Sequence, residues 1–166
     1  MKIRCADLTN DSIVDGDGYR LTVFTQGCPH ECPGCQNPQS WPAAGGKEMD
    51  TADILAKVLA NPLLSGVTFS GGEPFLQPEP LADLAKKLHQ SNLNIWIFTG
   101  YTLEELEAMP SPHIQELLAQ ADVLVDGRYE ESLRDLTLHF RGSSNQRVID
   151  MNKTRNARHI ILKYTD

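Results

Sequence analysis

The chain has 166 residues and a formal net charge of −7 at pH 7, with 40% hydrophobic and 22% charged residues. This length and composition are typical of one globular domain that needs neither disulfides nor a structural metal, and they exclude the disordered and fibrous classes. The acidic balance argues against a nucleic-acid partner, which requires a concentrated basic surface, because the densest basic stretch, residues 153–158, is short.

The N-terminal segment shows no targeting signal. Residues 1–7 lack the apolar run of a signal peptide, and no run of about 18 apolar residues occurs in the chain. We therefore expect a cytoplasmic protein without a membrane partner, formed by one domain over residues 1–166. Three of the four cysteines lie within residues 28–35. In a reducing compartment this crowding predicts metal thiolates rather than disulfides.

Strand and helix patterns alternate along the chain. Residues 19–25 alternate polar with apolar side chains and predict a strand that leads into the cysteine cluster. Residues 51–60 predict a helix with Asp50 or Thr51 as its cap. The other expected strands are 66–70, 94–98, 122–125, 147–150 and 159–164, and the other expected helices are 81–88, 103–108 and 113–120. This alternation predicts a parallel α/β architecture.

The strands are too few for a closed eight-fold barrel of roughly 250 residues, so we expect an open, partial parallel β/α barrel. The order of strand pairing cannot be deduced from the pattern. In parallel α/β sheets the ligand lies beyond the C-terminal strand ends. The cysteine cluster, the turn at Gly71 and residues 99–101 and 126–128 each follow an expected strand. We expect these four segments to line one shared mouth.

Cys28, Cys32 and Cys35 have the spacing CxxxCxxC, which lets a compact loop place three thiolates around one cluster. Bacterial ferredoxin segments supply a fourth cysteine nearby, and this chain does not, so one iron would remain open. The amino and carboxylate groups of S-adenosylmethionine can chelate an open iron. An electron from the reduced cluster can then break the carbon–sulfur bond of that cofactor.

A zinc site is the alternative for these cysteines, completed by His30 or Cys5 as the fourth ligand. The spacing lacks the second CxxC pair of many zinc sites, which disfavours this alternative. We expect Cys5 to be a small buried residue of an N-terminal strand, because free cysteine often packs as a core hydrophobe. We expect His30 to be a solvent-facing loop residue.

The cysteine motif followed by Gly71-Gly72-Glu73-Pro74 after a strand resembles the radical S-adenosylmethionine superfamily. More narrowly, the chain resembles the activating proteins of anaerobic ribonucleoside-triphosphate reductases, and this resemblance covers nearly the whole chain. The segments that carry the narrower resemblance are residues 27–35, 70–74, 99–101, 123–127 and 141–147.

The resemblance implies an oxidoreductase of the radical S-adenosylmethionine barrel type with a 4Fe-4S cluster. It would produce a 5′-deoxyadenosyl radical that removes hydrogen from a glycine of the large reductase subunit, leaving a stored glycyl radical. A low-potential flavodoxin or ferredoxin is the expected electron donor. The alternatives are an activase of another glycyl-radical enzyme, of the pyruvate formate-lyase type, and a non-enzymatic zinc or iron-sulfur binding protein.

The resemblance also implies the residues that bind S-adenosylmethionine. Glu73 can accept a hydrogen bond from the ammonium group, while Gly71 and Gly72 allow backbone carbonyls to come close. The alternative is an ordinary glycine turn with a solvated glutamate. Arg128 can pair with the methionyl carboxylate or form a surface ion pair instead. The expected cofactor contacts are Gly34, Gln36, Gly71, Gly72, Glu73, Pro74, Asp126, Arg128, Ser144 and Asn145.

Gly34 departs from the superfamily pattern, in which an aromatic residue commonly precedes the third cysteine. Backbone groups around Gly34 and Gln36 would then serve the adenine. Trp41 and Trp96 are better assigned to packing. No catalytic side chain is expected beyond the cluster and the cofactor. Because an incomplete barrel leaves its mouth open at the side, we expect a loop of another protein to be the substrate.

Overall fold

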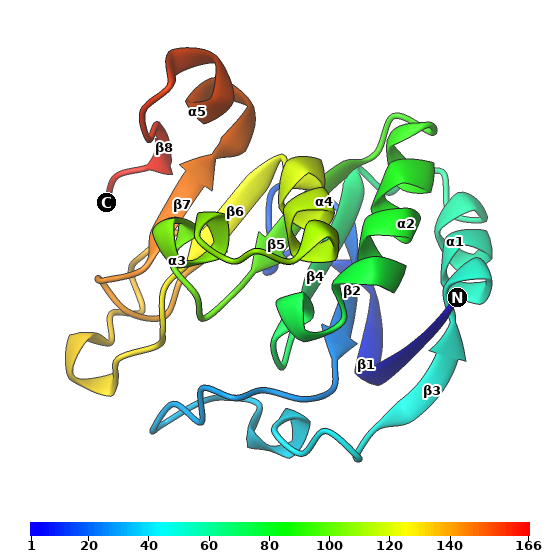
Figure 1. Cartoon of the computed structure of the whole chain (residues 1–166), viewed down its shortest axis with the longest axis horizontal. Helices are drawn as coiled ribbons and strands as arrows, with labels where there is room; N and C mark the ends of the chain where they lie inside the picture. Colours follow the sequence, from blue (N-terminus) through cyan, green and yellow to red (C-terminus); the bar gives the residue numbers. More distant parts are fainter.

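One eight-stranded sheet organises the chain in the computed structural model, which describes residues 1–166 (Figure 1). The strands are β1 (Lys2–Ser12), β2 (Arg20–Thr25), β3 (Lys47–Asp50), β4 (Gly66–Gly71), β5 (Asn94–Phe98), β6 (Val123–Asp126), β7 (Arg147–Asp150) and β8 (Leu162–Tyr164). The α-helices are α1 (Thr51–Leu59), α2 (Pro78–His89), α3 (Leu103–Glu107), α4 (Pro112–Gln120) and α5 (Met151–Ala157). Three short 3-10 helices are η1 (Pro38–Ser40), η2 (Pro74–Leu76) and η3 (Glu131–Leu133).

The centre of the sheet is parallel and its two sides are antiparallel. Strands pair in the order β3-β1-β2-β4-β5-β6-β7-β8, and the pairs β2–β4, β4–β5 and β5–β6 are parallel. The outer pairs are antiparallel. The sheet is open, as expected, but the expected parallel arrangement is confined to these four strands. The short connection from β1 to β2 explains one antiparallel pair, since a parallel pair needs a long crossover.

The central strands finish at one level. Thr25 at the end of β2 lies opposite Gly71 at the end of β4, and Phe98 of β5 lies opposite Val125 of β6. Parallel register therefore brings the segments that follow these strands to one edge of the sheet. This confirms that the loops selected from the sequence lie close to each other.

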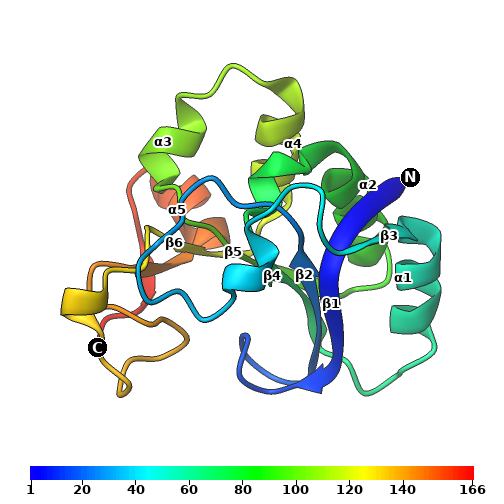
Figure 2. The same ribbon diagram turned by 90° about the horizontal axis from the view of Figure 1, so that it is seen from below.

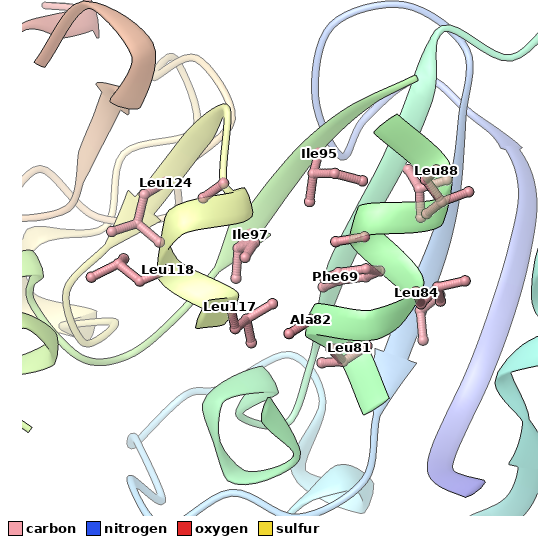
Figure 3. Close-up of a cluster of buried hydrophobic side chains, with 14 of the residues drawn as sticks. Phe69, Leu81, Ala82, Leu84, Leu88, Ile95, Ile97, Leu117, Leu118 and Leu124 are labelled. Atoms are coloured by element: carbon pink, nitrogen blue, oxygen red, sulfur yellow. The ribbon is translucent and has the colours of Figure 1, made fainter. Parts of the chain in front are cut away.

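Helices α2, α3 and α4 lie together on one side of the sheet, and α1 lies beside β3 (Figure 2). Figure 3 shows leucines of α2 and α4 pointing toward the central strands. Leu81, Leu84 and Leu88 share one face of α2 and are at most 1% exposed, as the helical spacing predicts. This packing of α2 fixes the relative positions of the strands that end at the mouth.

The other face of the sheet has its own smaller apolar cluster. Side chains alternate between the two faces of a sheet along a strand. Ile95 and Ile97 therefore lie on one face, and Trp96 between them lies on the other. Trp96 is 2% exposed and packs with Val123, Val125 and Val148. The assignment of Trp96 to packing is confirmed.

The remaining differences from the expected elements are local. Asp50 caps α1, accepting a 2.9 Å hydrogen bond from the amide of Ala52. Strand β3 and helix α5 were not anticipated, and β8 is shorter than the expected strand. Arg155 of α5 donates to the carbonyl of Leu118 at the end of α4, whereas Lys153 and Arg158 are exposed. None of the helices has the length and apolar character that spanning a membrane would require.

We expect Leu84→Ala to lower the free energy of unfolding by about 2–5 kcal/mol, because it removes a fully buried side chain and leaves a cavity. Denaturant titration of the metal-free chain, followed by circular dichroism, measures this change. Leu63 is 72% exposed and provides the matched control. Leu63→Ala should change the free energy by less than about 0.5 kcal/mol, and equal losses in both variants would contradict the described core.

Candidate functional site

A pocket of about 990 Å³ opens at the C-terminal ends of the parallel strands. Each of the four central strands contributes to its lining. The contributing residues are Cys28, Cys32 and Cys35 after β2, Ser70, Gly71 and Gly72 at the end of β4, Phe98, Thr99 and Gly100 at the end of β5, and Val125 and Gly127 at the end of β6. The shared mouth expected from the sequence is confirmed.

The cysteine loop, residues 28–35, is closed at its base by backbone hydrogen bonds. The amide of Cys28 donates to the carbonyl of Trp41 at 3.1 Å. Within the loop, the amide of Cys35 donates to the carbonyl of Cys32 at 3.1 Å, and Gly34 adopts φ +77°. Glycine accommodates this backbone conformation without strain. Cys28, Cys32 and Cys35 all line the same pocket.

The three thiols are reduced and half-buried. Burial raises the pKa of Cys28 and of Cys32, and neighbouring backbone amides partly oppose this shift. The amide of Asn37 also donates to the sulfur of Cys35 at 3.4 Å. Amide donors around the sulfurs suit a metal-bound thiolate, whose charge they stabilise.

The donor set fits a cluster held by three cysteines. No three His, Cys, Asp or Glu side chains converge closely enough to hold a single metal ion. A four-iron cluster is larger than one ion, so its thiolates stand further apart. Cys5 lies in β1 at 1% exposure and does not line the pocket. The expectation that Cys5 is a small buried strand residue is confirmed.

Glu73 is fully buried, and its carboxylate accepts hydrogen bonds from three segments of the protein. The hydroxyl of Thr99 lies 2.8 and 2.9 Å from the two oxygens. The amides of Gly100 and Phe75 donate at 2.8 and 3.1 Å. His30 Nε2 lies 2.7 Å from Oε1. Glu73 thus links the turn after β4 to the end of β5 and to the cysteine loop.

Gly71 and Gly72 line the pocket and also allow β4 to approach the end of β2. A Cβ on Gly71 would lie 2.4 Å from the amide nitrogen of Thr25, and one on Gly72 would lie 2.3 Å from the carbonyl oxygen of Gly27. The amide of Gly72 donates to Thr25 at 2.8 Å. The close approach at these glycines is to the protein's own backbone, and the expected approach to the cofactor stays a prediction.

Asp126 and Arg128 lie at the end of β6 in ion pairs. Asp126 is 1% exposed, accepts from the amide of Leu103 at 2.8 Å and pairs with Arg147. Arg128 is exposed and binds Glu105 with both terminal nitrogens, at 3.1 and 3.3 Å. The positive charge of Arg128 also lowers the pKa of the Cys32 thiol, although burial dominates there.

The other expected cofactor contacts are divided between the pocket and its surroundings. Gln36 lines the pocket, whereas Ser144 and Asn145 are exposed residues outside its lining. Pro74 is buried at the start of η2. A Cβ on Gly34 would lie 2.9 Å from the carboxyl carbon of Glu131. A side chain at position 34 would therefore have to displace the end of the exposed Glu131 side chain.

The structure adds pocket residues that the sequence did not indicate. The expectation that His30 faces solvent is wrong, because its side chain is 5% exposed and contacts Tyr101 edge-on at 4.6 Å between ring centroids. The position of His30 between Cys28 and Cys32 was the sequence feature that could have indicated a place in the pocket. Trp41, assigned to packing, also lines the pocket, and its indole nitrogen is buried without a hydrogen-bond partner.

Comparisons with known proteins agree with a cluster-binding site. Residues 14–149 match the family described as "4Fe-4S single cluster domain". The chain is 37% identical to the anaerobic ribonucleoside-triphosphate reductase-activating protein of Escherichia coli (strain K12), over 82% of this chain and 91% of that protein. It is 35% identical to the protein of the same description from Enterobacteria phage T4, over 81% and 86%.

One solved structure is similar to this protein in fold only. QueE from Escherichia coli aligns with a TM-score of 0.53 at 16% identity, over 76% of this chain and 70% of that chain. At this identity the alignment carries no conclusion about substrate.

The thiol of Cys5 provides a prediction on pH and stability. Burial raises the pKa of Cys5 from 9.0 to about 11. Between these values the unfolded chain loses the thiol proton while the folded chain keeps it, so stability falls as pH rises. Denaturant titrations from pH 8 to pH 11, under reductant, should show the stability of Cys5→Ala falling less than that of the unmodified chain. A constant difference between the two proteins across that range would refute this.

Proposed function

The chain belongs to the family of anaerobic ribonucleoside-triphosphate reductase-activating proteins and to the 4Fe-4S single cluster domain family, and on this basis we propose that it is the activase of such a reductase. The cofactors are a 4Fe-4S cluster and S-adenosylmethionine. When bound, they supply an electron and a cleavable carbon–sulfur bond, from which a 5′-deoxyadenosyl radical arises to remove hydrogen from a glycine of the large reductase subunit.

The observation that carries this proposal is the placement of three thiols without a fourth. Cys28, Cys32 and Cys35 line one pocket at the ends of the parallel strands, while Cys5 is buried in β1. We assign the three pocket cysteines as cluster ligands. Three ligands leave one iron free for the amino and carboxylate groups of S-adenosylmethionine.

The lining supports some of the expected cofactor contacts directly. Gln36, Gly71 and Gly72 line the pocket beside the cysteines, so their backbone groups can orient the methionyl and adenosyl parts. Arg128 stands near Cys32 and is exposed. It can exchange Glu105 for the cofactor carboxylate, because both offer the same bidentate geometry.

The remaining expected contacts have less direct support. Glu73 and Asp126 are held by internal hydrogen bonds, so either carboxylate would have to release a donor to accept from the cofactor. Gly34, Pro74, Ser144 and Asn145 are proposed as cofactor contacts from the resemblance alone.

An exposed apolar rim supports a protein substrate. Ile13, Val14 and Leu136 are 64%, 72% and 78% exposed, and all three line the pocket. Apolar side chains gathered around a pocket mark a surface that another macromolecule covers. We propose that the large reductase subunit docks there in the cytoplasm, and that a flavodoxin or ferredoxin supplies the electron.

Replacement of single cysteines tests the cluster assignment. We expect Cys28→Ala, Cys32→Ala and Cys35→Ala each to abolish cleavage of S-adenosylmethionine, because each removes one cluster ligand. Anaerobic reconstitution should give a brown protein with about four irons per chain only when all three are present. Cys5→Ala is the control and should retain both iron and cleavage. Full cleavage by any of the three pocket variants would contradict the assignment.

Charged substitutions at the rim test the protein substrate. The double variant Val14→Asp, Leu136→Asp should lower glycyl radical formation on the reductase about tenfold or more, since each buried interface anchor contributes on the order of 1 kcal/mol. Electron paramagnetic resonance after mixing with the reductase measures the radical. Leu63→Asp, at an equally exposed leucine outside the pocket, is the control.

The identity of the partner is read from the same experiment. A radical on a pyruvate formate-lyase type enzyme, and none on the reductase, would assign the protein to a different activase class. A colourless zinc protein that forms no radical on either partner would refute an activase altogether.

A further inference from the structure

The contact between His30 and Glu73 joins segments that lie 43 residues apart in the sequence. Its two atoms are 2.7 Å apart, and the side chains are 5% and 0% exposed. His30 stands between Cys28 and Cys32 in the cysteine loop, whereas Glu73 follows β4. Apart from the cysteine sulfurs, no other side chain of the loop hydrogen bonds to another part of the protein. This hydrogen bond therefore attaches the cysteine loop to the segment that follows β4.

The His30 ring occupies a shaped socket. Tyr101 contacts it edge-on at 4.6 Å. On another side, a Cβ at Gly100 would lie 2.4 Å from Cδ2 of the ring. Gly100 therefore leaves the space that the imidazole fills, and any larger residue there would push the ring out. Both shape and hydrogen bonding thus fix the position of His30 against β5.

Glu73 has hydrogen-bond donors other than His30. The hydroxyl of Thr99 and the amides of Gly100 and Phe75 still donate to the carboxylate if the imidazole is removed. Loss of His30 would therefore leave the buried charge paired by three residues. The consequence of its loss falls on the other end of the contact, the cysteine loop.

We propose that His30 is a positioning residue that acts through Glu73. It fixes the cysteine loop against the ends of β4 and β5, and so sets where Cys28 and Cys32 stand relative to Gly71 and Gly72. The role of this placement rests on the proposed function, in which the cysteines hold the cluster and the glycines face S-adenosylmethionine. The attachment of the loop itself is a property of the metal-free chain.

Hydrogen exchange of the metal-free chain tests the attachment. His30→Leu fills the socket without a donor, while His30→Gln keeps one. We expect the hydrogen-bonded amides of Cys28 and Cys35 to exchange about tenfold faster in His30→Leu, because a hydrogen bond to a charged group shifts local opening by about that factor. His30→Gln should restore most of the protection. The rates are compared with those of Ile97 in the core, which corrects for any change in global stability.

His89 provides a matched control. It pairs with Asp122 at 2.8 Å, outside the pocket. His89→Leu should leave exchange in the cysteine loop unchanged relative to Ile97. Equal loop exchange in His30→Leu and the unmodified chain would overturn the proposal, and so would an equal increase in His89→Leu.

A spectroscopic measurement tests the consequence for the site. After reconstitution to equal iron content, we expect the electron paramagnetic resonance spectrum of reduced His30→Leu to respond to S-adenosylmethionine only at about tenfold higher concentration. His30→Gln should respond nearly as the unmodified protein does. The double variant His30→Leu, Glu73→Gln should be no worse than Glu73→Gln alone, because the two residues act as one unit. Additive losses would show that His30 does not act through Glu73.

The two measurements separate this inference from the proposed function. If neither the unmodified chain nor any variant assembles an iron-sulfur cluster, the proposed function fails. Faster loop exchange in His30→Leu would still support the attachment in that case. If clusters assemble and the exchange is unchanged, the attachment is refuted and the proposed function stands.

Discussion

The buried carboxylate of Glu73 is the point at which three strand ends meet. Its oxygens accept from Thr99 and Gly100 at the end of β5, and His30 brings in the cysteine loop that follows β2. The backbone amide of Glu73 donates to the carbonyl of Gly27 at 2.8 Å. A buried charge is tolerated only when its hydrogen bonds are complete. The same bonds that satisfy this carboxylate therefore hold the cysteine loop and the glycine turn in one place.

A second group of charges lies around the end of β6, next to the pocket residues Val125 and Gly127. Asp126 at the end of β6 is paired with Arg147 at the start of β7, and Arg128 is paired with Glu105 at the start of α3. These pairs differ in burial, since Asp126 is enclosed and Arg128 is exposed. The enclosed pair fixes the strand end, whereas the exposed arginine remains free to change partners. The end of β6 thus carries one buried ion pair and one exposed ion pair.

The open side of the sheet agrees with an activating protein. A closed barrel would enclose its ligand, but here antiparallel strands flank four parallel ones and the pocket remains open. Exposed apolar residues of the β1–β2 connection and of the segment after η3 border that opening. The pocket thus remains accessible from the side on which the proposed protein substrate would approach.

The sequence by itself determined most of the helices and strands and the segments that line the pocket. Strands β5 and β7 have the expected bounds, and Leu81, Leu84 and Leu88 face the core, because periodicity is a local property. Parallel strand ends must meet at one edge, which brought the cysteines and the glycine turn together. Only the tertiary structure decided that the outer strands pair antiparallel and that His30 is buried against Glu73. Both depend on contacts between distant segments, which no local pattern encodes.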